Sequence, residues 1–218
     1  MAAITGQYGA FWGPKKDQNG KLASSVAFAE ETMTRQADNK TYIIDDPDLR
    51  YWDKTKPLVV EESTDGGSSW TPVASGFTVQ HAGGVVVFDE ADATRDVRVS
   101  GYAYELEEKM GFFSWTLTID VVQHEVANFQ TDGWVENVPG NKSWTAEAEQ
   151  HWNSTDKLDD WIGELLPVTF FVDDQSTRKW RYEGVGYISQ DAVTTPQGEL
   201  VTRTIRFTGD GPVWRRTG

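Results

Sequence analysis

The sequence predicts a mainly β fold, and three observations lead to that prediction. Residues 112–122 alternate between apolar and polar side chains, which is the period of a half-buried strand. Short apolar segments flank glycine-containing turns at 63–68 and 82–84, as the strands of β-hairpins do. Two longer apolar-rich segments, 179–191 and 199–208, are joined by a turn that contains proline and glycine, and this pattern predicts a long terminal hairpin.

The N-terminal part predicts a first hairpin over residues 4–33. Its turn is the Gly-Pro-Lys-Lys-Asp-Gln-Asn-Gly segment at 13–20, and 25–33 forms the return strand. Residues 41–44 form a short strand, and the Asp-Asp-Pro-Asp segment at 45–48 is a turn.

The middle of the chain predicts a compact set of short strands. These are 58–62 paired with 70–73, 77–80 paired with 85–88, and 97–106. Their regular spacing indicates a small module of β-hairpins over 38–108, inserted between residues 1–37 and 109–218.

A second group of long strands follows residue 112. Residues 124–129 are expected to form a short turn or helical piece, and 132–140 a loop. Beyond the loop, alternation predicts a strand with two distinct faces: Trp144, Ala146, Ala148 and Trp152 on one, and Thr145, Glu147, Glu149 and His151 on the other.

One α-helix is predicted at about 155–165. Leu158, Trp161, Ile162 and Leu165 recur at i, i+3, i+4 and i+7, which is the apolar stripe of an amphipathic helix. Ser154 is placed to cap it, and Asp156, Asp159 and Asp160 fall in its first turns, where the helix dipole favours anions. Pro167 is expected to end the helix before a strand at 168–172.

Composition narrows the class of protein. The chain has 218 residues, a formal net charge of −14 and no cysteine, so disulfides, thiolate metal sites and thiol nucleophiles are excluded. An acidic surface repels nucleic acid phosphates, which fits either a soluble protein unrelated to DNA or a wall along which DNA moves without sticking. The sequence predicts neither a secretion signal nor a membrane span.

No reaction centre is predicted. His81, His124 and His151 lack the i+3 or i+4 partner of a helical metal site, and the acidic residues of 45–48 lack calcium-loop spacing. Glu147 and Glu149 have the separation of an inverting glycosidase pair, but an exposed acidic strand face explains them better in a chain with 34 Asp and Glu. We therefore expect no catalytic residue, no cofactor and no metal ligand, and no enzyme activity.

From residue 121 onward, the sequence resembles a known protein family. The segment VVQHEVANFQTDGWVENVPGNKSWTAEAEQHW, the helix predicted after it, and the ending KWRYEGVGYISQDAVTTPQGELVTRTIRFTGDGPV resemble the major tail tube proteins of long-tailed (siphovirus-type) bacteriophages. Residues 1–33 supply that family's opening hairpin, and the likeness covers about two thirds of the chain. Residues 38–108 depart from the pattern as the inserted module.

The resemblance implies a tail-tube-type β-sandwich or barrel with one flanking α-helix. It also implies a structural virion protein of the phage tail, assembled in the cytoplasm of a bacterial host, whose homo-hexameric rings stack into a tube. Its implied partners are further copies of itself, a tape-measure protein, and the tail terminator and distal tail proteins. DNA would pass through during ejection without specific binding, and no membrane is involved.

Three acidic residues are predicted to line the channel. Glu147, Glu149 and Glu183 lie opposite the bulky Trp144, Trp152, Trp180 and Tyr182, and the alternative is that their face meets the outer solvent. Two rival functions stay open: another tail or secretion-tube ring component, and a carbohydrate-binding β-sandwich module that uses Trp52, Trp70 or Trp134.

Overall fold

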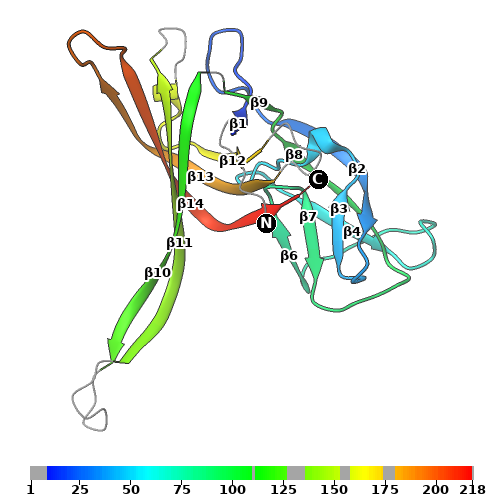
Figure 1. Ribbon diagram of the computed structural model, residues 1–218. Helices are drawn as coiled ribbons and strands as arrows, with labels where there is room; N and C mark the ends of the chain where they lie inside the picture. The colour runs from blue at the N-terminus through cyan, green and yellow to red at the C-terminus, as the bar shows by residue number, and fades with distance from the viewer. Residues whose placement is uncertain (1–8, 110, 127–135, 153–157, 174–179, 218) are drawn as a thin grey trace.

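The computed structural model describes residues 9–109, 111–126, 136–152, 158–173 and 180–217. They form two seven-stranded sheets in which every pair of neighbouring strands is antiparallel. The sheets lie side by side, and one long hairpin extends beyond both (Figure 1). The mainly β prediction is confirmed.

The first sheet contains the four longest strands of the described chain. Its order is β10-β11-β14-β13-β12-β1-β9, and it curls into a half-barrel (Figure 1). The strands are β1 (Ala10–Pro14), β9 (Leu106–Glu108), β10 (Phe112–Val126), β11 (Glu136–His151), β12 (Leu165–Phe171), β13 (Arg181–Thr194) and β14 (Thr202–Arg216).

The second sheet is built from shorter strands in the order β5-β4-β8-β2-β3-β7-β6. They are β2 (Val26–Arg35), β3 (Thr41–Ile44), β4 (Val59–Ser63), β5 (Thr71–Pro72), β6 (Phe77–Gln80), β7 (Val85–Phe88) and β8 (Asp96–Ala103). The short 3-10 helix η2 (Pro47–Leu49) follows β3, and the Asp46 side chain caps it by accepting from the Asp48 amide.

Each sheet has its own apolar core. The first core gathers Phe11, Trp144, Phe170, Ile205 and Phe207. The second is centred on Tyr42, Trp52 and Val99, which are at most 1% exposed. Because the two clusters share no residue, each sheet buries its own apolar face.

The packing of the Trp144 indole requires glycine at neighbouring positions. A Cβ added to Gly209 would lie 2.2 Å from the indole, and one added to Gly184 would lie 2.7 Å from it. The indole N–H donates to the Gly211 carbonyl at 3.0 Å, which fixes the ring orientation. The Trp144 indole therefore packs directly against the backbone of these glycines in β13 and β14.

The predicted N-terminal hairpin over 4–33 is wrong. Strand β1 pairs with β12 and β9, whereas β2 pairs with β3 and β8 in the other sheet. Turn chemistry at 13–20 indicates a reversal of the chain, but it does not decide which strands pair afterwards. Residues 4–8 of that prediction lie outside the described residues.

The sheets do not divide at residues 38 and 108. Strand β2 belongs to the second sheet although it precedes residue 38, and β9 belongs to the first although it precedes residue 109. The proposed division into a domain of residues 1–37 plus 109–218 and an inserted module at 38–108 stays a prediction.

The predicted α-helix at 155–165 is not found in the described part of that range. Residues Leu158–Trp161 form a single 3-10 turn, η3, and β12 already begins at Leu165. Gly163, at φ +86°, ends the turn, and Pro167 lies inside the strand that was expected to follow. Leu158 and Trp161 are buried, but Ile162 is 50% exposed, so the apolar spacing reflects a turn plus a strand. Ser154 and Asp156 lie outside the described residues.

Two further local predictions are corrected by the long β10–β11 hairpin. Strand β10 continues through Val126, where a turn or helical piece was expected from residue 124. Strand β11 begins at Glu136, inside the expected loop at 132–140, and Pro139 pairs with Gln123 in the ladder. The hairpins β4–β5, β6–β7 and β13–β14, in contrast, are confirmed.

We predict that Gly209→Ala destabilises the protein, because the new methyl group would overlap the Trp144 indole. The expected loss is about 2–3 kcal/mol of unfolding free energy, measured by urea denaturation. Gly13→Ala is the matched control, since its Cβ would lie at an ordinary 3.5 Å from Lys109 and Phe11. Equal stability of the two variants would contradict this account of Trp144 packing.

Candidate assembly surface

One face of the first sheet is polar along β11. Along β11, Trp144, Ala146 and Ala148 are at most 2% exposed, whereas Glu147 and Glu149 lie on the opposite face. On the adjacent strands, Glu147 is paired with Thr116 of β10 and Arg206 of β14, and Glu149 with Ser114 of β10 and Thr204 of β14. The predicted alternation of β11 is thus confirmed for residues 144–149, and it produces a surface rich in hydroxyl groups. Trp152, predicted on the buried face, lies beyond the end of β11 and is 48% exposed.

The two glutamates make different contacts. Glu147 accepts from the Arg206 guanidinium at 2.7 Å, and both side chains stay about half exposed, at 44% and 50%. Glu149 accepts from the Ser114 hydroxyl at 2.7 Å. Because Arg206 is paired, this face presents no unpaired arginine at that point, and its carboxylates remain in contact with solvent.

Glu183 does not belong to this surface. It is opposite Tyr182 on β13, as predicted, but it is 0% exposed because the second sheet covers that position. Its carboxylate pairs with the Arg181 and Arg216 guanidinium groups and accepts from the Tyr51 hydroxyl at 3.1 Å. A carboxylate enclosed by its own chain cannot line a channel, so the lumen prediction is wrong for Glu183.

Glu183, Arg181, Arg216 and Tyr51 form a junction cluster that ties the two sheets together. Arg216 of β14 also donates to Gln80 Oε1 of β6 at 2.6 Å. A Cβ on Gly83 would lie 2.8 Å from both Arg216 and Glu183, so the β6–β7 turn packs directly on the ion pair. Lys54 adds an ion pair to Asp210 at 2.6 Å nearby.

Burial in the junction cluster changes the acid–base behaviour of Tyr51. Desolvation, reinforced by the Glu183 charge, raises the pKa of Tyr51 to about 12. Desolvation and Asp53 likewise raise the pKa of Tyr104 to about 12. Both phenols are therefore held neutral in the folded protein.

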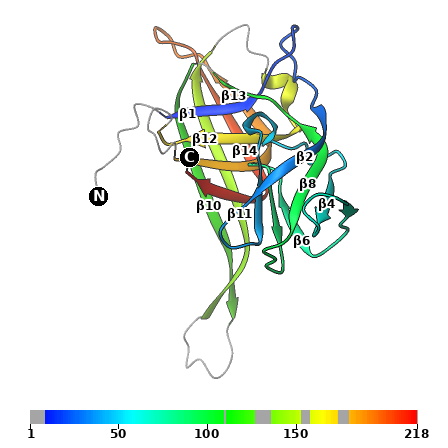
Figure 2. The same ribbon diagram turned by 90° about the vertical axis from the view of Figure 1, so that its right-hand side faces the viewer.

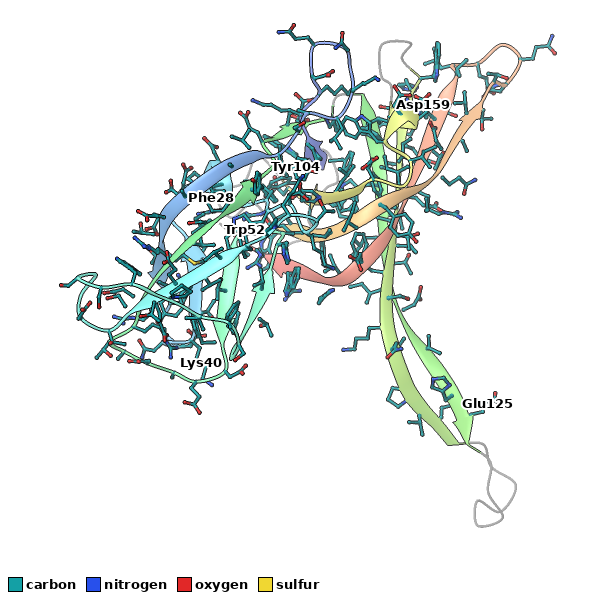
Figure 3. The ribbon with its side chains drawn as sticks, turned by 180° about the vertical axis from the view of Figure 1, so that it is seen from behind. Phe28, Lys40, Trp52, Tyr104, Glu125 and Asp159 are labelled. Carbon is teal, nitrogen blue, oxygen red and sulfur yellow. The ribbon has the colours of Figure 1, made fainter. Side chains whose placement is uncertain are left out.

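The β10–β11 hairpin continues beyond the sheet as a two-stranded arm. Strand β11 pairs with β14 only over Thr145–His151, so residues 136–144 pair with β10 alone. The arm leaves the body of the molecule (Figure 2), and Glu125 near its end lies far from the second sheet (Figure 3). It exposes Ile119, Val121, Val122 and Val138, each at 39–53%. Since an isolated two-stranded ribbon with apolar side chains in water is marginal at best, the arm is suited to pack against another molecule.

Two strand segments of the first sheet have an open backbone edge. Strand β10 ends the sheet order, so one side of its 15 residues has no strand partner among the described residues. Strand β13 pairs with β12 only over Arg181–Tyr187. Beyond it, Gln190–Thr194 pair with β14 alone in the described part of the chain. Such edges are templates for pairing with another chain.

The described residues offer little support for a metal site or a sugar-binding site. Within the described ranges, no group of three His, Asp or Glu side chains is close enough to hold a metal ion. Trp52 is 1% exposed in the second core, and Arg98 covers the Trp70 ring at 4.6 Å, so neither offers a free platform for a sugar. Trp134 lies outside the described residues. No helix in the described part of the chain has the length and apolarity to cross a membrane.

Comparisons with known proteins give a weak structural likeness. No protein-family model matches the sequence, and no curated protein matches it. One similar solved structure is described as the tail of an empty gene transfer agent particle computed with C6 symmetry; identity is 14%, the TM-score is 0.42, and the match covers 50% of this chain and 85% of the other. A second is described as the virion of a native gene transfer agent particle, with 14% identity, a TM-score of 0.41, and 50% and 88% coverage. Both TM-scores are too low to establish a common fold.

We predict that the protein loses stability as pH rises from 10 to 12. The folded pKa of Tyr51 lies above the ordinary value of about 10, so its contribution is complete below pH 10 and is lost as pH approaches 12. Tyr51→Phe should make the fall in unfolding free energy shallower, by on the order of 2 kcal/mol over this range. Tyr187→Phe, which removes an exposed phenol, is the control; denaturation series at fixed pH values measure both. An unchanged slope in Tyr51→Phe would contradict the assignment.

Proposed function

We propose that this protein is the tube-forming structural component of a phage-type tail, in which six copies close into a ring and rings stack into a conduit for DNA. The observation that carries the proposal is the open edge of β10, at one end of a run of four long adjacent strands, β10-β11-β14-β13. The sequence resemblance to major tail tube proteins supports the same function.

The open segments suggest how copies join. The free side of β10 in one copy pairs with the free side of β13 at Gln190–Thr194 in the next, so each copy contributes four strands to a continuous inner sheet. A closed barrel of about 24 strands, spaced ~4.8 Å apart and tilted ~40°, has a backbone diameter of roughly 45–50 Å. Side chains then leave roughly 35–40 Å, which is wide enough for a DNA duplex whose major groove alone is about 12 Å across.

The polar face of the first sheet suits a channel wall. Glu147 and Glu149 line the lumen, Arg206 is neutralised by its pairing with Glu147, and serine and threonine hydroxyls fill the space between them. A wall of this kind repels phosphates and binds DNA neither tightly nor specifically. The chain thus acts by assembly and passage, without catalysis or a cofactor.

The remaining partners follow from that function. Rings assemble around a tape-measure protein in the bacterial host cytoplasm, and the tube contacts terminator and distal tail proteins in the virion. The exposed apolar arm provides contacts between neighbouring copies or rings. A different tail or secretion-tube ring component is the second candidate, favoured by the same open edges. The carbohydrate-binding alternative is weakened because Trp52 is buried in the second core and cannot contact a sugar.

Electron microscopy of the purified full chain tests the assembly. We expect six-fold rings at high concentration and, where rings stack, uniform tubes. Isolated rings that never stack would favour the second candidate, and a protein that stays monomeric at every attainable concentration would contradict the proposal.

The lumen assignment is tested by charge reversal in tail particles. Glu147→Lys combined with Glu149→Lys should slow or stop DNA release, because the new ammonium groups would attract phosphates. Asp89→Lys combined with Glu90→Lys is the matched control, since it makes the same charge change on exposed residues of the second sheet. Normal release from particles that carry the Glu147 and Glu149 changes would overturn the assignment of this face to the lumen.

A further inference from the structure

The direction of the joint between neighbouring copies follows from the four long strands. Each neighbouring pair in β10-β11-β14-β13 is antiparallel, so β13 runs opposite to β10 within one copy. In a head-to-tail ring of identical copies, β10 of one copy meets β13 of the next. That joint is therefore antiparallel as well, and strand direction alternates without interruption around the whole ring.

The two faces of the strands limit the register of this joint to every second position. Through Thr204 and Glu149, Ala192 of β13 is level with Ser114 of β10, and all four lie on the polar face. Because a slip of one residue moves every side chain to the other face, Ala192 of the next copy has to lie an even number of residues from Ser114. Along β10, the polar-face positions after Ser114 are Thr116, Thr118, Asp120 and Val122.

The tilt of a closed barrel selects among these positions. The stagger between copies, counted from Ser114, is spread over the four strands that each copy contributes. With ~3.3 Å per residue and ~4.8 Å between strands, staggers of two, four and six residues give tilts of about 19°, 35° and 46°. Closed barrels have tilts of roughly 35–45°. A stagger of four residues fits this range, and it sets Ala192 opposite Thr118.

The side chains also favour a stagger of four over a stagger of six. At four, Gln190 of one copy lies opposite Asp120 of the other, and both are exposed in the single chain. The amide can then donate to the carboxylate. At six, Gln190 would face Val122, an apolar residue at which the ladder with β11 also shifts register.

We propose that neighbouring copies join in this register, with Thr118 of β10 opposite Ala192 of β13 in the next copy. The inference rests on the proposed six-fold ring and adds the side-chain contacts of each joint. On the apolar face, Val193, 49% exposed in the single chain, packs opposite Leu117. Leu117 itself packs against the first core, so Val193 extends that core across the joint. Gln190 and Asp120 pair on the polar face.

Engineered disulfides report the register directly, because the chain has no cysteine. In the full chain, Ala192→Cys is combined in turn with Thr116→Cys, Thr118→Cys or Asp120→Cys, and assembled rings are oxidised. A disulfide needs Cβ atoms about 3.5–4.5 Å apart, which diagonal neighbours in a ladder do not reach. Strands β11 and β14 separate the two positions within one copy, so the bond forms between copies. The pair with Thr118→Cys should give at least tenfold more covalent multimers than either matched control.

A second set of variants tests the same register on the apolar face. Val193→Cys is combined with Leu117→Cys, and Val193→Cys with Ile119→Cys is its matched control. Opposite residues in an antiparallel ladder alternate between a wider and a closer pair. One of the two expected pairs, Ala192 with Thr118 or Val193 with Leu117, is therefore of the closer kind.

Nonreducing electrophoresis measures the covalent multimers, and electron microscopy of the same samples under reducing conditions shows whether each variant forms rings. Multimers from an expected pair support the register. Rings in which a control pair cross-links instead, or in which no pair cross-links, overturn the register and leave the ring itself standing. If the wild type forms no rings, the proposed function fails and the register fails with it.

Discussion

The open edge of β10 is the constraint on which the rest of this structure depends. A 15-residue strand at the end of a sheet leaves a row of backbone N–H and C=O groups facing outward. Proteins that stay monomeric protect such edges with proline, lysine, β-bulges or very short strands. Strand β10 contains neither proline nor lysine, and the register of its ladder with β11 shifts at two places while the strand remains 15 residues long. The opposite edge of the same sheet is the three-residue β9, which is short enough to need no protection. This asymmetry is what a strand intended for pairing with another copy would show.

The interior of the molecule supports that edge. Trp144 packs on the glycines of β13 and β14, and because successive side chains of a strand point to opposite faces, Glu147 and Glu149 lie on the other side of the sheet. The second sheet is held to the first by the Tyr51 hydroxyl, which donates to Glu183, by the hydrogen bond from Arg216 to Gln80, and by the Lys54–Asp210 ion pair. The ion pairs of Glu183 with Arg181 and Arg216 lie within the first sheet and hold that carboxylate in place. The polar face and the open edge are therefore parts of one rigid frame.

Local sequence signals predicted the parts of the fold that depend on neighbours in the chain. The hairpins β4–β5, β6–β7 and β13–β14 follow from turn residues and alternation, as does the outward direction of Glu147 and Glu149. The failures are non-local. Strand β1 finds its partner at Phe171, far along the chain, and no pattern near residue 10 carries that information. Alternation placed Glu183 opposite Tyr182 but could not show that the second sheet covers it, and the spacing of Leu158 and Trp161 is shared by a helix and a single turn.

Amide hydrogen exchange along β10 tests the central claim most directly. In a ladder, alternate amides of an edge strand point away from its only partner, so in the free chain about half of the β10 amides exchange rapidly. If copies pair along this edge, those amides become protected as the protein is moved from dilute to concentrated solution, while amides in the cores stay as they were. Exchange of the outward β10 amides that is equally fast at every concentration, or that is already slow in the monomer, would contradict the account.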